Sequence, residues 1–225
     1  MMNRISVAID GPGGAGKSTA AKALAEKFGF AYVDTGAIYR TIGLAVLRAG
    51  ALPTSAEQVV PVLHASRVDL DYDNTGLQHM LLNGEDVSRD IRLPEISSYA
   101  SKVSALGPVR DALLELQREQ ARRRSVVMDG RDIGTVVLPD ATLKVFLTAS
   151  PEVRAWRRWT ELQRRGTPQL FDDVYREMAE RDLRDSTRAA APLVPAADAV
   201  KVDSSRLSFD EVVAVLCRLV EGKKE

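Results

Sequence analysis

The spacing of apolar residues alternates between two patterns in the first part of the chain. Residues 4–10 form a short apolar run followed by glycines, which predicts a buried parallel strand. From Lys17 to Gly29 the apolar residues recur at helical spacing, and a second strand over 30–33 and a second helix ending at Gly50 follow. This order of strand, helix, strand and helix predicts a parallel sheet covered by helices.

The pattern changes between about residues 67 and 87. Val68, Leu70 and Tyr72 alternate with charged residues, and turn-forming residues follow at 73–76. Residues 77–83 then form a second β-prone run. We therefore expect a small antiparallel insertion in an otherwise α/β chain.

Beyond the insertion the α/β alternation returns. Pro94 and Pro108 each stand where a helix can begin, because proline suits the first helical turn. Strands are expected in three short apolar runs, at 125–129, 143–147 and 199–202. Helices are expected from Ser150 to about residue 165, over about 172–186, and after Ser208, whose spacing from Glu211 fits a capping box.

Composition narrows the class of protein. The 225 residues are 45% hydrophobic and 28% charged, which is ordinary for a globular chain. The 31 basic and 31 acidic residues cancel, and no apolar run approaches the roughly 18 residues of a membrane span. A single cysteine, Cys217, excludes an internal disulfide and a cysteine metal cage. We expect a cytoplasmic monomer with neither nucleic acid nor a membrane as partner.

Residues 11–18 match the phosphate-loop pattern G-x-x-x-x-G-K-[ST] between a predicted strand and a predicted helix. Glycines let the backbone N–H groups point inward, and the helix N-terminus adds a partial positive charge. Lys17 is expected to reach the β- and γ-phosphates, and the Ser18 hydroxyl to bind Mg²⁺. The predicted nucleotide-binding residues are Gly11, Pro12, Gly13, Gly14, Ala15, Gly16, Lys17, Ser18 and Thr19.

The phosphate loop leaves the reaction open, because GTPases, motors and kinases share it. A kinase whose acceptor is itself a phosphate must bring two anions together, and therefore needs further arginines. Candidates are DTGAIYR at 34–40, DGRD at 129–132, Arg154 with Arg157 and Arg158, and Arg181 with Asp185 and Arg188. Each could instead be a solvated helix face, an exposed ion pair or a turn. Their positions at strand ends and on two successive helices favour a phosphate site.

Several long motifs resemble those of the bacterial cytidylate kinases, a nucleoside monophosphate kinase family. They are DGPGGAGKST, DTGAIYR, SKVSALGPVR, DGRDIGTVVLPDA and ERDLRDSTRAAAPLVPAADA, and the resemblance runs from Ile5 to the last helix. It implies an α/β phosphate-loop kinase core with a five-stranded parallel sheet and helices on both faces, at about 1–60, 106–149 and 187–225. It also implies a monophosphate-binding insert with a small antiparallel sheet at about 61–105 and a mobile lid at about 150–186.

The same resemblance implies transfer of the γ-phosphoryl group of ATP to CMP or dCMP, with Mg²⁺. It assigns catalytic roles to Lys17, Arg131, Arg157, Arg158 and Arg188. It places the acceptor phosphate at Arg40, Arg131 and Arg188, the cytosine edge at Ser101, Arg110 and Asp185, and the sugar at Thr35, Asp132 and Arg181. Asp129 would hold the Mg²⁺ shell through water, beside Ser18.

Cytosine chemistry agrees with this assignment. Its amine donates while N3 and O2 accept, so a carboxylate beside an arginine and a hydroxyl complements it. Uracil would present a carbonyl oxygen to Asp185, a mismatch of about 1–3 kcal/mol. Two alternatives stay open: a phosphate-loop kinase for UMP, shikimate or a sugar acid, and a slowly hydrolysing switch or nucleic-acid-binding module. The N-K-x-D stretch typical of a guanine-specific GTPase is absent from the sequence.

Overall fold

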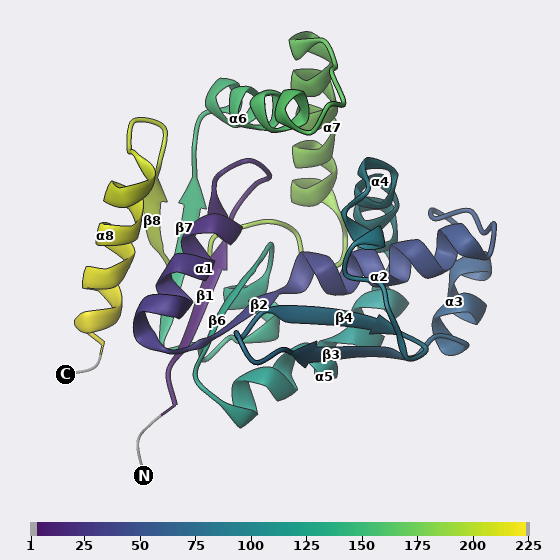
Figure 1. Cartoon of the computed structure of the whole chain (residues 1–225), viewed down its shortest axis with the longest axis horizontal. Helices are drawn as coiled ribbons and strands as arrows, with labels where there is room; N and C mark the ends of the chain where they lie inside the picture. The colour runs from purple at the N-terminus through teal and green to yellow at the C-terminus, as the bar shows by residue number, and fades with distance from the viewer. Residues whose placement is uncertain (1–3, 224–225) are drawn as a thin grey trace. The chain divides into compact units, whose positions relative to one another are not determined.

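Five strands form a parallel sheet in the order β2-β6-β1-β7-β8 (Figure 1). Their bounds are Ala31–Asp34 (β2), Val126–Gly130 (β6), Ser6–Asp10 (β1), Leu143–Thr148 (β7) and Val200–Asp203 (β8). Ile9 of β1 lies opposite Val145 of β7, and both side chains are buried. The predicted five-stranded parallel sheet is confirmed.

The structure, a computed structural model, describes residues 4–223. It divides into two units. The first holds the described residues up to Phe30 and from Val127 onward, and the second is Ala31–Val126.

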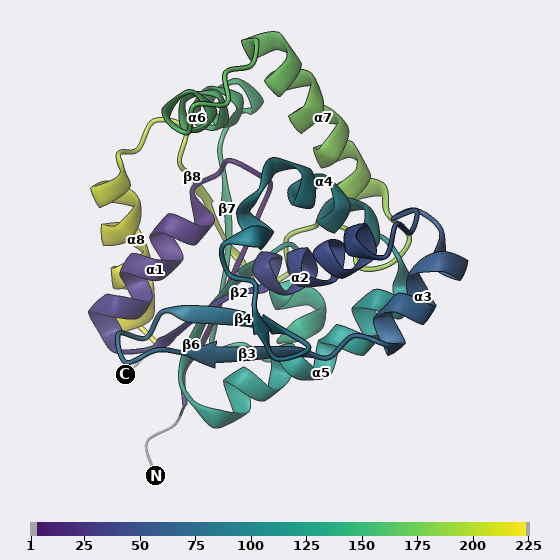
Figure 2. The same ribbon diagram turned by 45° about the vertical axis from the view of Figure 1, so that its right-hand side comes forward.

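The first unit carries the phosphate loop and the later helices. Helix α1 (Lys17–Phe28) lies beside α8 (Phe209–Glu221), and α6 (Pro151–Arg164) packs against α7 (Phe171–Thr187) (Figures 1 and 2). A five-residue π turn, η2 (Ile133–Val137), follows β6. The predicted hydroxyl cap at Ser150 and the capping box of Ser208 with Glu211 are both present. Cys217 is buried in α8, the helix that Ser208 caps.

The second unit is mainly helical and contains the predicted antiparallel insertion. Its helices are α2 (Thr35–Arg48), α3 (Ala56–His64), η1 (Asp90–Arg92), α4 (Pro94–Val103) and α5 (Gly107–Arg123). Strands β3 (Val68–Tyr72), β4 (Gln78–Leu82) and β5 (Glu85–Asp86) form a three-stranded sheet, and both pairings are antiparallel. The core of this unit includes Ile38, Ile42, Met80, Ile91 and Ile96, all of them buried.

Helix α3 and the η2 turn were not predicted from the sequence. Helix α3 is short and contains Pro61, which disguises its helical spacing, although Ser55 caps it and Val59 and Leu63 are buried. The η2 turn has hydrogen bonds that span five residues, a pattern without a characteristic apolar spacing. Both elements depend on packing more than on local propensity.

Candidate functional site

The phosphate loop lies between β1 and α1, as the sequence predicts. A Cβ atom at Gly11 would lie 1.9 Å from the carbonyl oxygen of Leu147, so no side chain fits there. Gly16 caps α1 in a left-handed conformation (φ 90°) without a side-chain hydrogen bond. The first N–H groups of α1 therefore have no capping side chain, which is the arrangement that binds phosphate oxygens.

Lys17 is buried at the start of α1, and its Nζ donates to the carbonyl oxygen of Pro12 at 2.8 Å. Burial, and next the guanidinium of Arg131, hold the pKa of Lys17 well below its usual value, while Asp129 opposes this shift. Positive groups are thus concentrated beside the loop. Negative charge near them would be stabilised, which is the electrostatic condition for binding polyphosphate.

Ser18 and Asp129 form the candidate metal position. The Ser18 hydroxyl donates to the Asp129 carboxylate at 2.8 Å, and Asp129 is buried at the end of β6. A hydroxyl oxygen and a carboxylate side by side suit Mg²⁺, which takes one or two protein oxygens together with phosphates and water. The donor set therefore fits the predicted metal.

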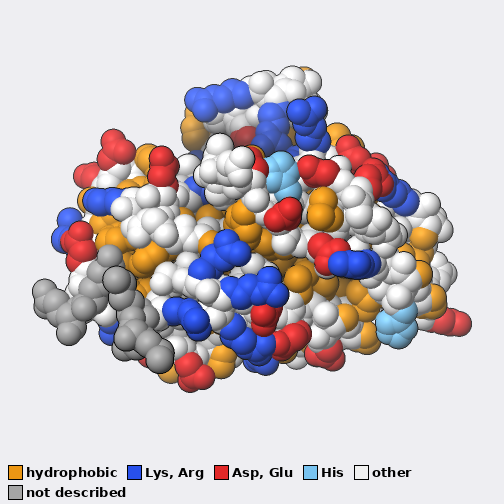
Figure 3. Space-filling model, turned by 60° about the horizontal axis from the view of Figure 1, so that its bottom comes forward, with side chains coloured by type: hydrophobic (Ala, Val, Ile, Leu, Met, Phe, Trp, Pro, Cys, Tyr) orange, Lys and Arg blue, Asp and Glu red, His pale blue; other side chains and the backbone are white. Residues whose placement is uncertain are grey.

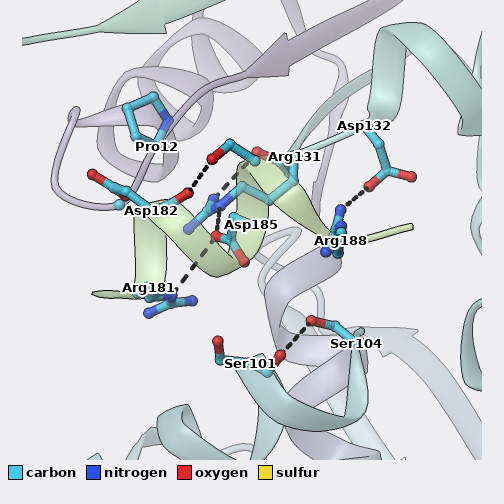
Figure 4. Close-up of polar contacts among 12 residues, drawn as sticks. Pro12, Ser101, Ser104, Arg131, Asp132, Arg181, Asp182, Asp185 and Arg188 are labelled. Atoms are coloured by element: carbon cyan, nitrogen blue, oxygen red, sulfur yellow. Dashed lines mark hydrogen bonds and ion pairs between the residues drawn. The ribbon is translucent and has the colours of Figure 1, made fainter. Parts of the chain in front are cut away.

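Five predicted residues meet between the loop after β6 and the end of α7. Nε of Arg131 donates to the Asp185 carboxylate at 2.9 Å, and Nε of Arg181 lies 3.9 Å from the same oxygen (Figure 4). Nη2 of Arg188 donates to Oδ1 of Asp132 at 3.4 Å. Side chains far apart in the sequence thus form two ion pairs in one unit.

The pKa of Asp185 follows from this arrangement. Burial acts to raise it, but the guanidinium groups of Arg131, Arg181 and Arg188 outweigh burial and hold it below its ordinary value. Asp185 is therefore a carboxylate, and an acceptor of hydrogen bonds, throughout the neutral range.

The three arginines of α6 that the sequence analysis singled out have different partners. Arg154 is buried and donates to Gly13 O at 3.2 Å and to Asp182 at 2.5 Å. Arg157 donates to Ser204 and, at 3.4 Å, to Ala15 O. Two of the three therefore reach backbone carbonyls of the phosphate loop. Arg158 instead pairs with Glu161 on its own helix at 2.9 Å, the interaction that a solvated helix face would make.

Thr35 and Arg40 lie in the second unit, at the start of α2. The Asp34 carboxylate caps α2 through Ala37 N at 2.9 Å, accepts from Arg92 at 3.0 Å, and lies 3.9 Å from Arg40. Burial acts to raise the pKa of Asp34, yet Arg40 and Arg92 hold it lower. Arg40 is thus held beside the N-terminus of a helix.

The other two predicted residues of this unit, Ser101 and Arg110, converge on Ser104. Ser104 donates through its hydroxyl to Ser101 O at 3.0 Å, and its own carbonyl accepts from Arg110 at 3.1 Å. The guanidinium carbon of Arg110 also lies 5.4 Å from the ring centre of Tyr39. The backbone that follows α4 is therefore bonded to the Arg110 guanidinium, and Ser101 and Arg110 are both buried.

Three charged residues around these groups were not singled out from the sequence. They are Asp10, Asp182 and Arg92. Asp10 ends an apolar strand immediately before the phosphate loop, a local signal that could have identified it. Asp182 and Arg92 lie on polar segments with many other charges, and only the fold distinguishes them.

Comparison with known proteins decides the family. The family model described as cytidylate kinase matches residues 7–222. The chain belongs to the cytidylate kinase family. The cytidylate kinase of Desulfitobacterium hafniense (strain Y51) is 47% identical over 100% of this chain and 96% of the relative. That of Pelotomaculum thermopropionicum is also 47% identical, over 98% of each chain. The resemblance based on the motifs is confirmed.

A solved structure agrees at the level of fold. An uncharacterized protein from Eubacterium ventriosum ATCC 27560 is similar with a TM-score of 0.50 over 97% of this chain and 99% of its own. The two share 14% sequence identity, so this similarity concerns the fold alone.

The surface adds two further observations. Basic and acidic side chains are interspersed on the face shown in Figure 3, in keeping with the equal numbers of positive and negative residues. Among the described residues, no helix combines the length and the apolar character that crossing a bilayer requires.

Proposed function

We propose that this member of the cytidylate kinase family is an ATP-dependent kinase that converts CMP and dCMP to CDP and dCDP, with release of ADP. One observation carries the proposal. Arg131 donates to Asp185 and also faces the phosphate loop, because a Cβ atom at Gly13 would lie 3.7 Å from its Nη2. A single guanidinium is thus placed beside both the ATP-binding loop and a residue assigned to the cytosine edge.

The reaction breaks the bond between the γ-phosphorus of ATP and the oxygen that bridges to the β-phosphate. A phosphate oxygen of CMP forms the new bond to the same phosphorus. Both partners are anions, so the chief requirement is cations that lower their repulsion and hold them in line. Lys17, Arg131 and Arg188 supply these cations, with Arg157 and Arg158 from α6. No general base is required, because the attacking phosphate oxygen is already ionised.

Mg²⁺ is the proposed cofactor beside ATP. The Ser18 hydroxyl would hold it directly and Asp129 through water, and the ion would neutralise charge on the β- and γ-phosphates. The Ser18–Asp129 hydrogen bond of 2.8 Å supports this pairing, because it puts the two oxygens at one place. A Ser18→Ala variant should raise the Mg²⁺ concentration needed for half-maximal rate.

Three groups of residues are proposed to hold the acceptor. We propose that Arg40, Arg131 and Arg188 hold its phosphate, that Ser101, Arg110 and Asp185 contact the cytosine edge, and that Thr35, Asp132 and Arg181 surround the sugar. In this proposal the insert (about 61–105) takes part in holding CMP, and the lid (about 150–186) closes over the transferring phosphoryl group so that water is excluded. The protein would act as a monomer in the cytoplasm.

A coupled assay for ADP release tests this function. ATP and Mg²⁺ are supplied with CMP, dCMP, UMP or no acceptor. We expect rapid ADP release with CMP or dCMP, much slower release with UMP, and almost none without an acceptor. Equal rates with UMP and CMP would contradict the cytosine assignment. Release without any acceptor would instead indicate a hydrolase.

A further inference from the structure

The carboxylate of Asp10 connects the strand before the phosphate loop, β1, to the turn after β6. Its Oδ1 accepts from the backbone N–H of Ile133, and its Oδ2 accepts from that of Gly134, each at 2.7 Å. Asp10 is buried, so these are short, charge-assisted bonds without competing solvent. Ile133 and Gly134 are the first two residues of the η2 turn.

Such N–H groups at the start of a helical turn usually bond to the side chain of the residue that precedes the turn. Here that residue is Asp132, which is itself a good capping residue. Its side chain makes no capping bond, and its carboxylate accepts from Arg188 at 3.4 Å instead. Asp10, from another strand, occupies the capping position in its place.

Gly134 permits this arrangement. A Cβ atom at residue 134 would lie 3.1 Å from Cδ of Lys144 and 3.4 Å from Oδ2 of Asp10. The absence of a side chain therefore lets the Gly134 N–H approach the carboxylate closely. The turn then continues with Val136 and Val137 N–H groups donating to the carbonyl of Asp132.

We propose that Asp10 is a positioning residue for the acceptor site: by capping η2 from strand β1, it leaves the Asp132 carboxylate available to Arg188. This proposal rests on the proposed function, in which Asp132 and Arg188 hold CMP. The loop that carries Arg131 and Asp132 is thereby tied to the residue directly before Gly11. The donor and acceptor sides of the reaction thus share one buried anchor.

Asp10 and Asp132 are alternative caps for the η2 turn. In an Asp10→Asn variant the amide accepts only one of the two N–H groups and presents a donor to the other. The nearest replacement acceptor is Asp132, whose carboxylate can rotate toward its own turn. Arg188 then loses its hydrogen bond to Asp132, so the acceptor site is disturbed through Asp132.

Steady-state kinetics of Asp10→Asn, Asp132→Asn and the double variant test this claim. We expect each single variant to raise KM for CMP about tenfold, the effect of one charge-assisted hydrogen bond, with KM for ATP within about twofold. The double variant should resemble either single variant. Asp140→Asn, an exposed carboxylate shortly after the same turn, is the matched control and should behave as the unmodified protein. If the two single effects multiply to about a hundredfold, or if Asp10→Asn only lowers the melting temperature, the proposal fails.

Amide hydrogen exchange without substrates provides a second readout. Asp10→Asn should accelerate exchange at residues 133 and 134, whereas Asp132→Asn should leave these amides protected. If Asp10→Asn does not fold, Asp132→Asn alone still decides, because loss of protection there would identify Asp132 as the cap. If the unmodified protein does not phosphorylate CMP, the proposed function fails. Hydrogen exchange then tests the capping role of Asp10 independently of activity. Unchanged exchange at residues 133 and 134 in Asp10→Asn would overturn that role.

Discussion

Arg131 and Asp185 lie 54 residues apart in the chain and join the end of β6 to α7 through a hydrogen bond of 2.9 Å. Asp185 is almost fully buried, and 19% of the Arg131 side chain is exposed. The pair therefore orients a cation beside the phosphate loop while keeping a carboxylate ionised on the side assigned to cytosine.

The first prediction concerns base specificity. Asp185→Asn keeps the size of the side chain but replaces a carboxylate oxygen with an amide donor. We expect the preference for CMP over UMP to fall at least about tenfold, because the new donor can face the uracil carbonyl. The largely buried Arg131 would also lose a charged partner, which should lower the free energy of unfolding by about 3 kcal/mol.

Ratios of kcat/KM for CMP and UMP measure the first effect, and urea unfolding measures the second. Asp210→Asn, an exposed carboxylate in the first turn of α8, is the control. An unchanged CMP preference would remove Asp185 from the base-reading role.

The second prediction separates donor from acceptor binding. Arg188 is buried, and its Nε donates to Ala191 O at 2.7 Å while Nη2 meets Asp132. Arg188→Ala should reduce turnover by about a hundredfold or more, with ATP binding nearly intact, because the proposed function places this cation at the acceptor phosphate alone. Turnover assays and ATP titrations measure the two effects. Arg176→Ala, an exposed arginine on α7, the helix that Arg188 directly follows, should change neither. Equal loss of ATP binding and turnover would exclude this role for Arg188.

The third prediction concerns the phosphate-loop backbone. Gly11 and Gly29 both have a positive φ, 147° and 66°. A Cβ atom at Gly11 would lie 1.9 Å from Leu147 O, whereas nothing lies within 4 Å of one at Gly29. Gly29→Ala should therefore cost only the left-handed strain, about 1 kcal/mol. Gly11→Ala should cost several times more, or prevent folding, because strands β1 and β7 would have to separate. Thermal unfolding of both variants measures these two costs. Equal losses of stability in the two variants would show that the clash at Gly11 is relieved locally.

The fourth prediction concerns pH. Burial foremost, together with the nearby Asp132, raises the pKa of Asp10 to about 6 from a model-peptide value of 3.8, although Lys17 and the Ile133 and Gly134 amides oppose this. The folded protein therefore binds a proton between these values that the unfolded chain releases. The contribution of protonated Asp10 to the free energy of unfolding is fully present below about pH 4. It falls by up to about 3 kcal/mol as the pH rises to about 6.

Urea unfolding of the unmodified protein and Asp10→Asn between about pH 4 and pH 7 tests this linkage. The other carboxylates are common to both proteins, so the difference in their free energies of unfolding isolates Asp10. We expect the unmodified protein to lose stability relative to Asp10→Asn as pH rises. A constant difference across this range would show that Asp10 has an ordinary pKa.

Local features of the fold were predictable wherever neighbouring residues carry the signal. The Ser208–Glu211 capping box, the turn between β3 and β4, and the start of α6 at Ser150 each depend on residues within a few positions of one another. Helix α3 was missed because Pro61 interrupts a short apolar pattern that tertiary packing nonetheless supports. Arg158 shows the limit of spacing arguments. It shares a helix with Arg154 and Arg157, yet it pairs with Glu161 while the other two reach the phosphate loop.

The phosphate loop, most of the order of strands and helices, and membership of a kinase family could be predicted from the residues alone, because glycine conformations and residue spacing act over short stretches of chain. Which charges meet depends on the folded chain. Arg131 pairs with Asp185, Arg188 pairs with Asp132, and Asp10 caps a turn more than a hundred residues away. The reason is physical: a buried ion needs a partner at hydrogen-bonding distance, and pairs so distant in sequence come together only through the order in which the strands join the sheet and the packing of α7.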